Sequence, residues 1–234
     1  MTGAAESPAE TRIGRRALLG FAGLTAAGVL GGARIQEVLD RLLPGPDGAL
    51  ASLLPAQRFR IYSVTGTLPA RSPDTYRLRI GGLVARPLDL TLHDLRARPA
   101  ATLVRDFQCV TGWRVGAVRW GGARLSTLLD EAGAAPGAAV EFRSFDGRYT
   151  EALTAAQARR ADVVVAYEMN GRPLSSAHGG PARLYVAPMY GYKSCKWLGE
   201  ITVTDRPVSG FWEQRGYDAD GWVGRSNGRD DRPT

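Results

Sequence analysis

Short strand-like segments, rather than long helices, dominate residues 76–204 and most limit how this chain can fold. Residues 76–80 (YRLRI) alternate apolar and polar side chains and end at two glycines, which is typical of a half-buried strand. Residues 163–167 (VVVAY) form a continuous apolar run, which indicates a strand buried on both faces. Similar patterns predict further strands at residues 88–92, 102–104, 140–145, 182–186 and 200–204.

Helical patterns are fewer and shorter than the strand patterns. Residues 125–132 (LSTLLDEA) have helical apolar spacing and precede Gly133, a residue type that often ends helices. Thr91 and Thr154 are candidate N-caps for two briefer helices, at residues 92–98 and 153–160. The chain has no internal repeat and no regular alternation of strands and helices. We therefore expect an α+β fold, with mixed sheets and short helices.

The charge balance favours an anionic ligand over a nucleic acid. The 234-residue chain has a formal net charge of +7, with 30 Lys and Arg against 23 Asp and Glu. The basic residues are mostly arginines and are scattered, without a Lys/Arg-rich block or a nucleic-acid-binding motif. Isolated arginines match the geometry of phosphate groups, so they indicate an anionic cofactor or substrate.

The N-terminal residues 1–33 have the order of an export signal. A polar stretch precedes Arg15 and Arg16, and a small-residue apolar run follows at residues 17–33. The arginine pair and the mildly hydrophobic run resemble a twin-arginine signal, which exports folded proteins. A surface helix with an accidental arginine pair is the alternative, but the run is glycine-rich and would make a poor soluble helix.

The signal predicts a location outside the cytoplasm, in the periplasm or on the outer face of the cytoplasmic membrane. No clean A-x-A cleavage site ends the run, so cleavage and retention of residues 17–33 as a short anchor both stay open. Residues 34–43 have helical spacing, and the Pro- and Gly-rich stretch after them breaks the chain. Residues 34–56 are therefore interpreted as a helix and linker before the body of the protein.

Cys109 is the first candidate for chemistry. It lies in RDFQCVTGWRVGAVRW, between an apolar strand at residues 102–104 and Gly112. A thiolate there suits a soft metal or nucleophilic chemistry. A buried free thiol and a Cys109–Cys195 disulfide are the simpler alternatives. The chain has only 2 His, no H-E-x-x-H motif and no Cys-x-x-Cys pair, which excludes the common zinc sites.

A second candidate site lies in two loops that flank the strand at residues 182–186. The first loop is HGGP, beginning at His178, and its consecutive glycines can present backbone amides to an anion. Arg183 follows, and the second loop at residues 190–196 adds Lys193 and Lys196. Together these groups are typical of a site for a phosphate-bearing ligand.

Arg183 also has a simpler interpretation when it is taken alone. An arginine on a buried strand more often forms a structural salt bridge, here with Asp162 or Glu168. The glycine loop and the neighbouring lysines are what favour the phosphate interpretation.

The run AYEMNGRPLSSAHGGPARLYVAPMYGYKSCKWLGEITV closely resembles the sulfite oxidase family of molybdopterin enzymes. Its signature is HGxPxR followed by a loop ending in KW, and FQCVTGW resembles the metal-ligand cysteine loop of the family. The resemblance covers about residues 58–222. It implies that residues 57–234 form a molybdopterin-binding oxidoreductase domain of the sulfite oxidase type, and that the enzyme binds one Mo-molybdopterin.

The resemblance also implies roles for individual residues. Cys109 matches the cysteine that ligates molybdenum, and Tyr217 matches an active-site tyrosine whose phenol can donate a hydrogen bond to an oxygen. Other positions match residues that contact the pterin or its phosphate. These expected cofactor-binding residues are Phe59, Tyr62, Ser63, Ser144, His178, Arg183, Ser194, Cys195 and Lys196.

Two departures from sulfite oxidases bear on the reaction. Tyr62 stands where sulfite oxidases carry a substrate-binding arginine, which resembles the bacterial periplasmic methionine sulfoxide reductase type instead. The sequence ends at Thr234, so we expect no C-terminal immunoglobulin-like dimerisation domain. Arg114 and Arg119 lie near the cysteine loop in the sequence, and they keep an anionic substrate such as sulfite in consideration.

The expected function is oxygen-atom transfer, with reduction of a sulfoxide or a related S- or N-oxide. No haem-attachment motif is present, so we expect electrons to come from another protein, a membrane haem or quinol-linked subunit. Sulfite dehydrogenase is the alternative enzyme. A cofactor-free exported binding module, held together by a Cys109–Cys195 disulfide, is the alternative from another class.

Overall fold

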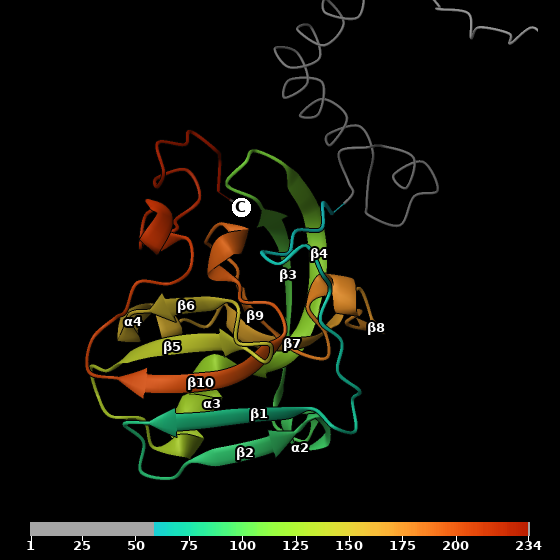
Figure 1. Ribbon diagram of the computed structural model, residues 1–234, viewed down its shortest axis with the longest axis vertical. Coiled ribbons are helices and arrows are strands. Elements are labelled where there is room, and N and C mark those ends of the chain that lie inside the picture. The colour runs from blue at the N-terminus through green and yellow to red at the C-terminus, as the bar shows by residue number, and fades with distance from the viewer. Residues whose placement is uncertain (1–58, 234) are drawn as a thin grey trace, which may run out of the picture. The chain divides into compact units, whose positions relative to one another are not determined.

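A computed structural model describes residues 59–233 (Figure 1). The expected signal at residues 1–33 and the linker at residues 34–56 lie outside the described residues. Within the described part of the chain, no helix is both long enough and apolar enough to cross a membrane.

The first sheet has five strands in the order β2-β1-β10-β5-β6 (Figure 1). β1 runs parallel to β10, and the other neighbours are antiparallel, so the sheet is mixed, as the sequence predicted. The strands are β1 (Arg77–Gly82), β2 (Leu88–Thr91), β5 (Ala139–Ser144), β6 (Thr150–Leu153) and β10 (Leu198–Thr204).

The second sheet has the order β3-β4-β7-β8, and β9 also pairs with β7, all antiparallel. Its strands are β3 (Ala100–Gln108), β4 (Arg114–Arg124), β7 (Val163–Met169), β8 (Arg172–Pro173) and β9 (Arg183–Val186). The strand expected at residues 102–104 is therefore much longer. Sequence patterns missed β4 because its three glycines weaken the strand signal.

Within residues 59–233, three short α-helices accompany the sheets: α2 (Leu92–Arg96), α3 (Leu125–Ala132) and α4 (Ala155–Ala158). α3 has the predicted bounds and ends at Gly133 in the left-handed conformation. Thr91 and Thr154 cap α2 and α4 through complete capping boxes. The predicted helix start at residue 153 is wrong, because Leu153 ends β6. The 3₁₀ turns are η3 (Ser176–His178), η4 (Gly191–Lys193) and η5 (Glu213–Arg215).

The sequence of β7 is a continuous apolar run because the strand lies between two apolar clusters. Alternate side chains, Val163 and Val165, pack into a large cluster with the first sheet and the helices. Val164 and Ala166 point the other way, into a second cluster with β3 and β4. Each of these four residues has 0% exposure, which confirms the prediction of a strand buried on both faces.

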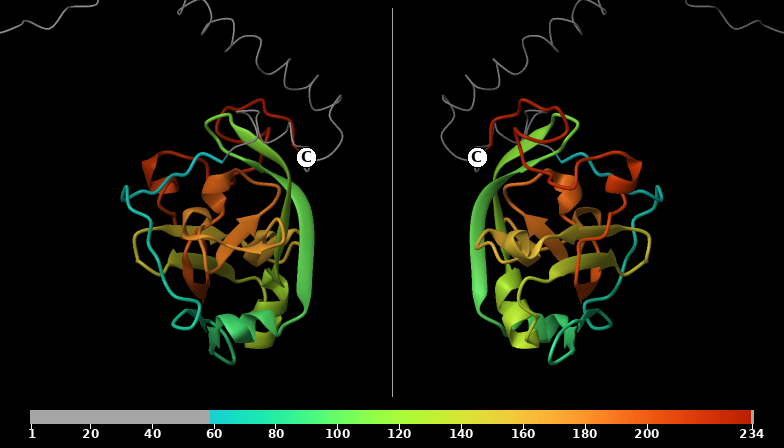
Figure 2. Two further views of the ribbon diagram at one scale, coloured as in Figure 1. Left: turned by 90° about the vertical axis from the view of Figure 1, so that its right-hand side faces the viewer. Right: turned by 90° about the vertical axis from the view of Figure 1, so that its left-hand side faces the viewer.

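The tip of the β3–β4 hairpin extends beyond the other strands toward the C-terminal segment (Figures 1 and 2). At its tip, Val110 packs against a third apolar cluster that includes Trp212 and Tyr217. A Cβ added to Gly112 would lie 2.7 Å from a guanidinium nitrogen of Arg229. The fold therefore brings the cysteine loop against residues that are about a hundred positions later in the chain.

Candidate functional site

Cys109 lies at the tip of the β3–β4 hairpin, directly after the last residue of β3. Its backbone amide donates to the carbonyl of Trp113 at 2.9 Å, and its carbonyl accepts from the amide of Gly112 at 3.0 Å. Gly112 has φ of +97°, a conformation that favours glycine, and this allows the tight turn. The Cys109 thiol is free and partly exposed, and its sulfur lies 3.2 Å from the Thr111 hydroxyl. The turn therefore presents an accessible sulfur on a rigid support.

Phe59 brings the HGGP loop to the base of the cysteine hairpin. Its ring centroid lies 4.8 Å from that of His178 and 5.3 Å from that of Phe107. The ring of Trp113, at 6.2 Å, completes this side of the cluster. The structure therefore brings together Phe59, His178 and the Cys109 hairpin, three of the segments that the sequence associated with one ligand.

Arg183 is buried without a carboxylate partner among residues 59–233. Its guanidinium donates to the carbonyls of His178 and Ser194, at 3.0 Å each, and to that of Leu184 at 3.2 Å. The alternative of a salt bridge with Asp162 is wrong, because Asp162 pairs with Arg160 at 2.8 Å. No ion pair to Glu168 forms within the described chain either. Burial lowers the pKa of Arg183 to about 10, which shows the cost of its unpaired charge.

Lys196, which is half-buried close to Arg183, also has no carboxylate partner in the described chain. Its ammonium donates to the carbonyl of Tyr62 and lies 4.4 Å from the ring centroid of Trp197. Burial, together with the nearby charge of Arg183, lowers the pKa of Lys196 to about 8. The contact with Tyr62 ties the N-terminal loop to the loop at residues 190–196. The hydroxyl of Ser63, next in that loop, bonds to the hydroxyl and the amide of Thr65.

The pKa of His178 is lowered, so its imidazole binds a proton less readily than a free histidine does. Burial is the main cause of this lowered pKa, and the positive charges of Arg183 and Lys196 lower it further. The three residues therefore form one positive cluster in which the imidazole stays neutral and can act as a hydrogen-bond partner.

The side chains of Ser194 and Cys195 face the protein interior. The Ser194 hydroxyl accepts from the amide of Val186 at 3.0 Å. Cys195 is fully buried in the main core, and burial raises the pKa of its thiol. Any contact of these two residues with a ligand must therefore come from their backbone. Both cysteines are free thiols, so the disulfide expected for a binding module does not form.

Lys193 does not supply charge to a ligand, contrary to the sequence interpretation. Its side chain has 1% exposure and pairs with Glu151 and Glu213, with Glu213 Oε1 at 2.6 Å. A third bond goes to the carbonyl of Ala152 at 2.9 Å. All donors of the ammonium are therefore satisfied inside the protein. Sequence patterns could not identify this cluster, because its members come from three distant segments.

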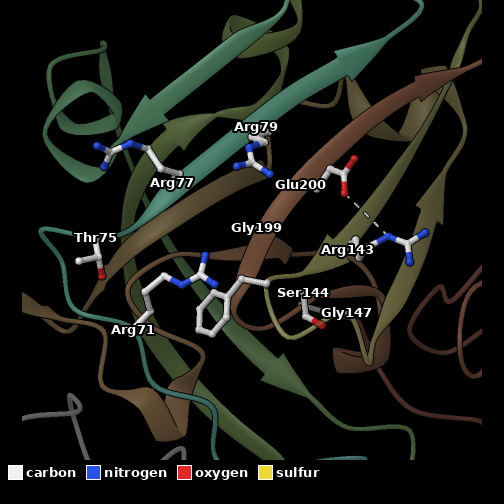
Figure 3. Close-up of a pocket in the computed structure, with 10 residues that line it drawn as sticks. Arg71, Thr75, Arg77, Arg79, Arg143, Ser144, Gly147, Gly199 and Glu200 are labelled. Atoms are coloured by element: carbon white, nitrogen blue, oxygen red, sulfur yellow. Dashed lines mark ion pairs between the residues drawn. The ribbon is translucent and has the colours of Figure 1, made fainter.

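Ser144 is placed at the end of β5 but is already bonded within its own turn. Its hydroxyl donates to Asp146 at 2.5 Å and accepts from the amide of Tyr149 at 3.0 Å. Ser144 also lines a pocket of about 340 Å³ on the first sheet (Figure 3). Four arginines and one glutamate give this pocket its charge: Arg71, Arg77, Arg79, Arg143 and Glu200.

Most of the charge in this pocket belongs to a row of ion pairs across the sheet. Arg79 stands opposite both Asp89 and Glu200, and Glu200 stands opposite Arg143 (Figure 3). The Arg79–Asp89 and Arg143–Glu200 contacts are each 3.9 Å long and exposed. Such alternating rows stabilise neighbouring strands, so they explain Arg79 and Arg143 without a ligand.

Tyr217 packs near the hairpin tip through two aromatic neighbours. Its ring centroid lies 5.1 Å from that of Trp212 and 5.4 Å from that of Tyr192. Tyr217 and Val110, the residue after Cys109, pack against the same apolar cluster. The structure therefore brings the predicted tyrosine to the cysteine loop, although the two lie far apart in the sequence.

The arginine predicted nearest to Cys109 is not available to an anion. Arg114 opens β4 and forms a salt bridge with Asp106, which also accepts the amide of Ala117 at 2.8 Å. Arg119 lies further along β4, with an exposed side chain. The arginine nearest to Cys109 in the sequence is therefore neutralised by a carboxylate, whereas Arg119 is exposed to solvent.

The donor set fits an anionic cofactor that also needs a sulfur ligand. Arg183 and Lys196 lie beside the HGGP loop without carboxylate partners in the described chain, and an accessible thiol lies on the adjoining hairpin. Burying unpaired cations is unfavourable, so a bound phosphate at Arg183 and Lys196 would relieve that cost. Residues 59–233 contain no group of three or more His, Cys, Asp or Glu side chains arranged to hold a metal ion.

Comparison with known proteins gives consistent similarities. Residues 65–212 match the family model of the oxidoreductase molybdopterin binding domain. The mitochondrial sulfite oxidases of Rattus norvegicus and Homo sapiens are each 35% identical over 179 residues, covering 64% of this chain and 33% of theirs. The uncharacterised oxidoreductase YuiH of Bacillus subtilis (strain 168) is 33% identical over 154 residues, covering 65% of this chain and 78% of its own.

A solved structure shows the same fold. The sulfane dehydrogenase SoxCD from Paracoccus pantotrophus superposes with a TM-score of 0.56 and 29% identity. The match covers 60% of this chain and 41% of that chain. The chain spans only 33% of the length of the mitochondrial sulfite oxidases that it matches.

Proposed function

Because the chain belongs to the sulfite oxidase family of molybdopterin-dependent oxidoreductases, we propose that it reduces a sulfoxide or a related S- or N-oxide by oxygen-atom transfer. The chain is an enzyme whose cofactor is Mo-molybdopterin. The observation that carries the proposal is an accessible Cys109 thiol near two buried or half-buried cations, Arg183 and Lys196, that have no carboxylate partner in the described chain.

Each part of the site has a role in holding this cofactor. Cys109 is the protein ligand of molybdenum, since its sulfur is free and presented by a tight turn. Arg183 and Lys196 neutralise the phosphate, and His178 bonds to the pterin as a neutral imidazole. Phe59 closes the apolar side. When bound, the cofactor supplies two-electron chemistry at the metal.

The chain's own residues orient the substrate oxygen and help to provide protons. Reduction of a sulfoxide consumes two electrons and two protons and releases a sulfide and water. Tyr217 donates a hydrogen bond to the substrate oxygen, a contact that strengthens as negative charge develops there. Trp212 and Tyr192 hold its ring in place and exclude water from that side.

Sulfoxide reduction is favoured over sulfite oxidation by the charges around the hairpin. Sulfite is an anion and needs cationic partners next to the metal. Arg114 is neutralised by Asp106, and Tyr62 stands at the position of the substrate-binding arginine of sulfite oxidases. Tyr62 is 58% exposed, so its neutral side chain is accessible to a ligand from solvent. These two observations support a substrate without negative charge.

A pair of dye-linked assays tests the proposed reaction. The protein is purified from a host that makes molybdopterin and is assayed with methionine sulfoxide and a reduced dye, then with sulfite and an oxidised dye. We expect turnover in the first assay and loss of it in Cys109→Ala. Turnover with sulfite alone would overturn the proposed substrate and indicate a sulfite dehydrogenase.

Export and an external electron donor complete the proposal. Arg15 and Arg16 precede a small-residue apolar run, which supports twin-arginine export and work in the periplasm or on the outer face of the cytoplasmic membrane. Electrons then come from a membrane haem or quinol-linked subunit. Replacing both arginines with lysine should leave the enzyme in the cytoplasm in a cell-fractionation experiment. Unchanged export in that variant would contradict this part of the proposal.

A further inference from the structure

A buried cluster of three ionisable side chains lies beside the cofactor loop. Lys193, Glu151 and Glu213 have side-chain exposures of 1%, 0% and 5%. Lys193 pairs with one carboxylate oxygen, Oε1, of each glutamate, and Glu151 Oε1 also accepts the amide of Ala152 at 2.7 Å. The residues come from η4, β6 and η5, three separate segments.

The cluster carries one negative charge too many if both glutamates are ionised. One ammonium and two carboxylates leave a net charge of −1 in a site without solvent, which is strongly unfavourable. The remaining carboxylate oxygens, Oε2 of Glu151 and Oε2 of Glu213, are buried and have no hydrogen-bond partner in the described chain. Ionised carboxylates can only accept hydrogen bonds, so neither glutamate can satisfy the other in that form.

We propose that Glu151 and Glu213 share one proton, so that the cluster is neutral and clamps the segment carrying Tyr217 onto the cofactor loop. A proton on one carboxyl group lets it donate to the other, which satisfies the orphaned oxygens. Burial, with the like charge of Glu213, raises the pKa of Glu151 well above its ordinary value, and the charge of Lys193 opposes this only in part.

The clamp contacts the C-terminal segment at two residues, one before and one after Tyr217. Lys193 binds Glu213, which follows Trp212 directly. The hydroxyl of Tyr192 donates to the carbonyl of Asp218 at 2.7 Å, immediately after Tyr217. Tyr217 is therefore fixed from both sides by consecutive residues of η4. Glu213 is thus a positioning residue; its value for catalysis rests on the proposed function, whereas the shared proton does not.

The titratable groups facing Glu151 come from η4, η5, the turn before β6 and the loop after η4. They include a cation, a carboxyl group, two phenols and a thiol: Lys193, Glu213, Tyr149, Tyr192 and Cys195. Burial raises the pKa of the phenols and of the thiol, so these three groups stay neutral near pH 7. Only Lys193 and the two glutamates therefore change the charge of the cluster.

Infrared difference spectroscopy on the full-length protein detects the proton directly. The parent should show the C=O stretching band of a protonated carboxyl group at neutral pH, and Glu213→Gln should lose it. Glu200→Gln, on the exposed sheet face, is the matched control and should keep the band. Absence of the band in the parent, or its survival in Glu151→Gln and Glu213→Gln alike, would overturn the shared proton.

Stability against pH gives a second readout that does not need the cofactor. The native cluster keeps a proton that an unfolded glutamate loses above its ordinary pKa of 4.5. Rising pH therefore destabilises the parent above 4.5, by up to about tenfold in the unfolding constant per pH unit. Glu213→Gln should remove this dependence relative to Glu200→Gln. Equal slopes in the two variants would contradict the proposal.

Hydrogen exchange tests the clamp separately from the proton. Glu213→Ala removes the bond to Lys193, so amide exchange in residues 212–218 should rise about tenfold or more. Glu213→Gln keeps a carbonyl acceptor and should leave exchange near the parent rate. Unchanged exchange in Glu213→Ala would show that this bond does not hold the segment.

Discussion

Among individual residues, Arg183 and Lys196 most clearly indicate that the site binds an anion. Each is a cation held by backbone carbonyls instead of carboxylates within residues 59–233. A protein gains little from such an arrangement unless an anion completes it. The motif HGGPAR located Arg183 in the sequence, but only the structure shows that its expected acidic partners are elsewhere. Lys193 shows the opposite case, since its charge is fully neutralised inside the protein.

The pKa of Lys196 makes cofactor loading dependent on pH. Burial and Arg183 hold that pKa at about 8 in the ligand-free site, and an anion binds the protonated form. Loading of apo-protein with molybdopterin should therefore weaken as pH rises through 8, when the ammonium loses its proton. Fluorescence of the released pterin after gel filtration measures the loaded fraction. Lys196→Arg should load equally on both sides of pH 8, whereas a parent without this decline would contradict the assignment.

Tyr217 is expected to act through its hydroxyl and not through its ring. Tyr217→Phe keeps the packing against Trp212 and Tyr192 while removing the hydrogen-bond donor. The kcat for methionine sulfoxide should fall about a hundredfold. Molybdenum content and the thermal midpoint should stay at the parent values. A variant with the parent kcat would exclude Tyr217 from the reaction.

At the scale of elements, local signals succeeded where caps and periodicity agree. Helix α3 has the predicted bounds because its apolar spacing and Gly133 both mark them. Strand β6 was missed because Leu153 precedes a good N-cap, Thr154, and reads as the first turn of a helix. Strand β4 was missed because glycines replace side chains in it. These glycines are needed because the strands pack closely together, and such tertiary contacts leave no signal in a local sequence pattern.

Gly122 is an example of this close packing, and its substitution provides a test. A Cβ at Gly122 would lie 2.3 Å from the carbonyl oxygen of Val165, whereas a Cβ at Gly81 would meet nothing within 4 Å. Gly122→Ala must push β4 away from β7 and should destabilise the protein by about 1–3 kcal/mol. Gly81→Ala, also in a strand, should be nearly neutral. Urea unfolding compares the two, and equal midpoints would refute the close approach of β4 and β7.

For the whole molecule, the site exists only because the topology joins distant segments. The family resemblance identified Cys109, His178 and Arg183, and the fold brings their loops together through Phe59. No sequence pattern pairs Lys193 with glutamates 42 and 20 positions away. Such contacts depend on how the C-terminal segment folds back over η4. Motifs thus named the candidate ligand residues, whose roles stay predictions, whereas the supporting contacts were visible only in the structure.

The central claim is that Cys109 ligates the molybdenum of a molybdopterin cofactor. Elemental analysis by mass spectrometry, on protein purified from a host that makes molybdopterin, tests it most directly. We predict near-stoichiometric molybdenum in the parent and in Cys195→Ala, whose thiol lies in the core, and its loss in folded Cys109→Ala. Molybdenum that is absent from the parent, or retained in full by Cys109→Ala, would contradict the account.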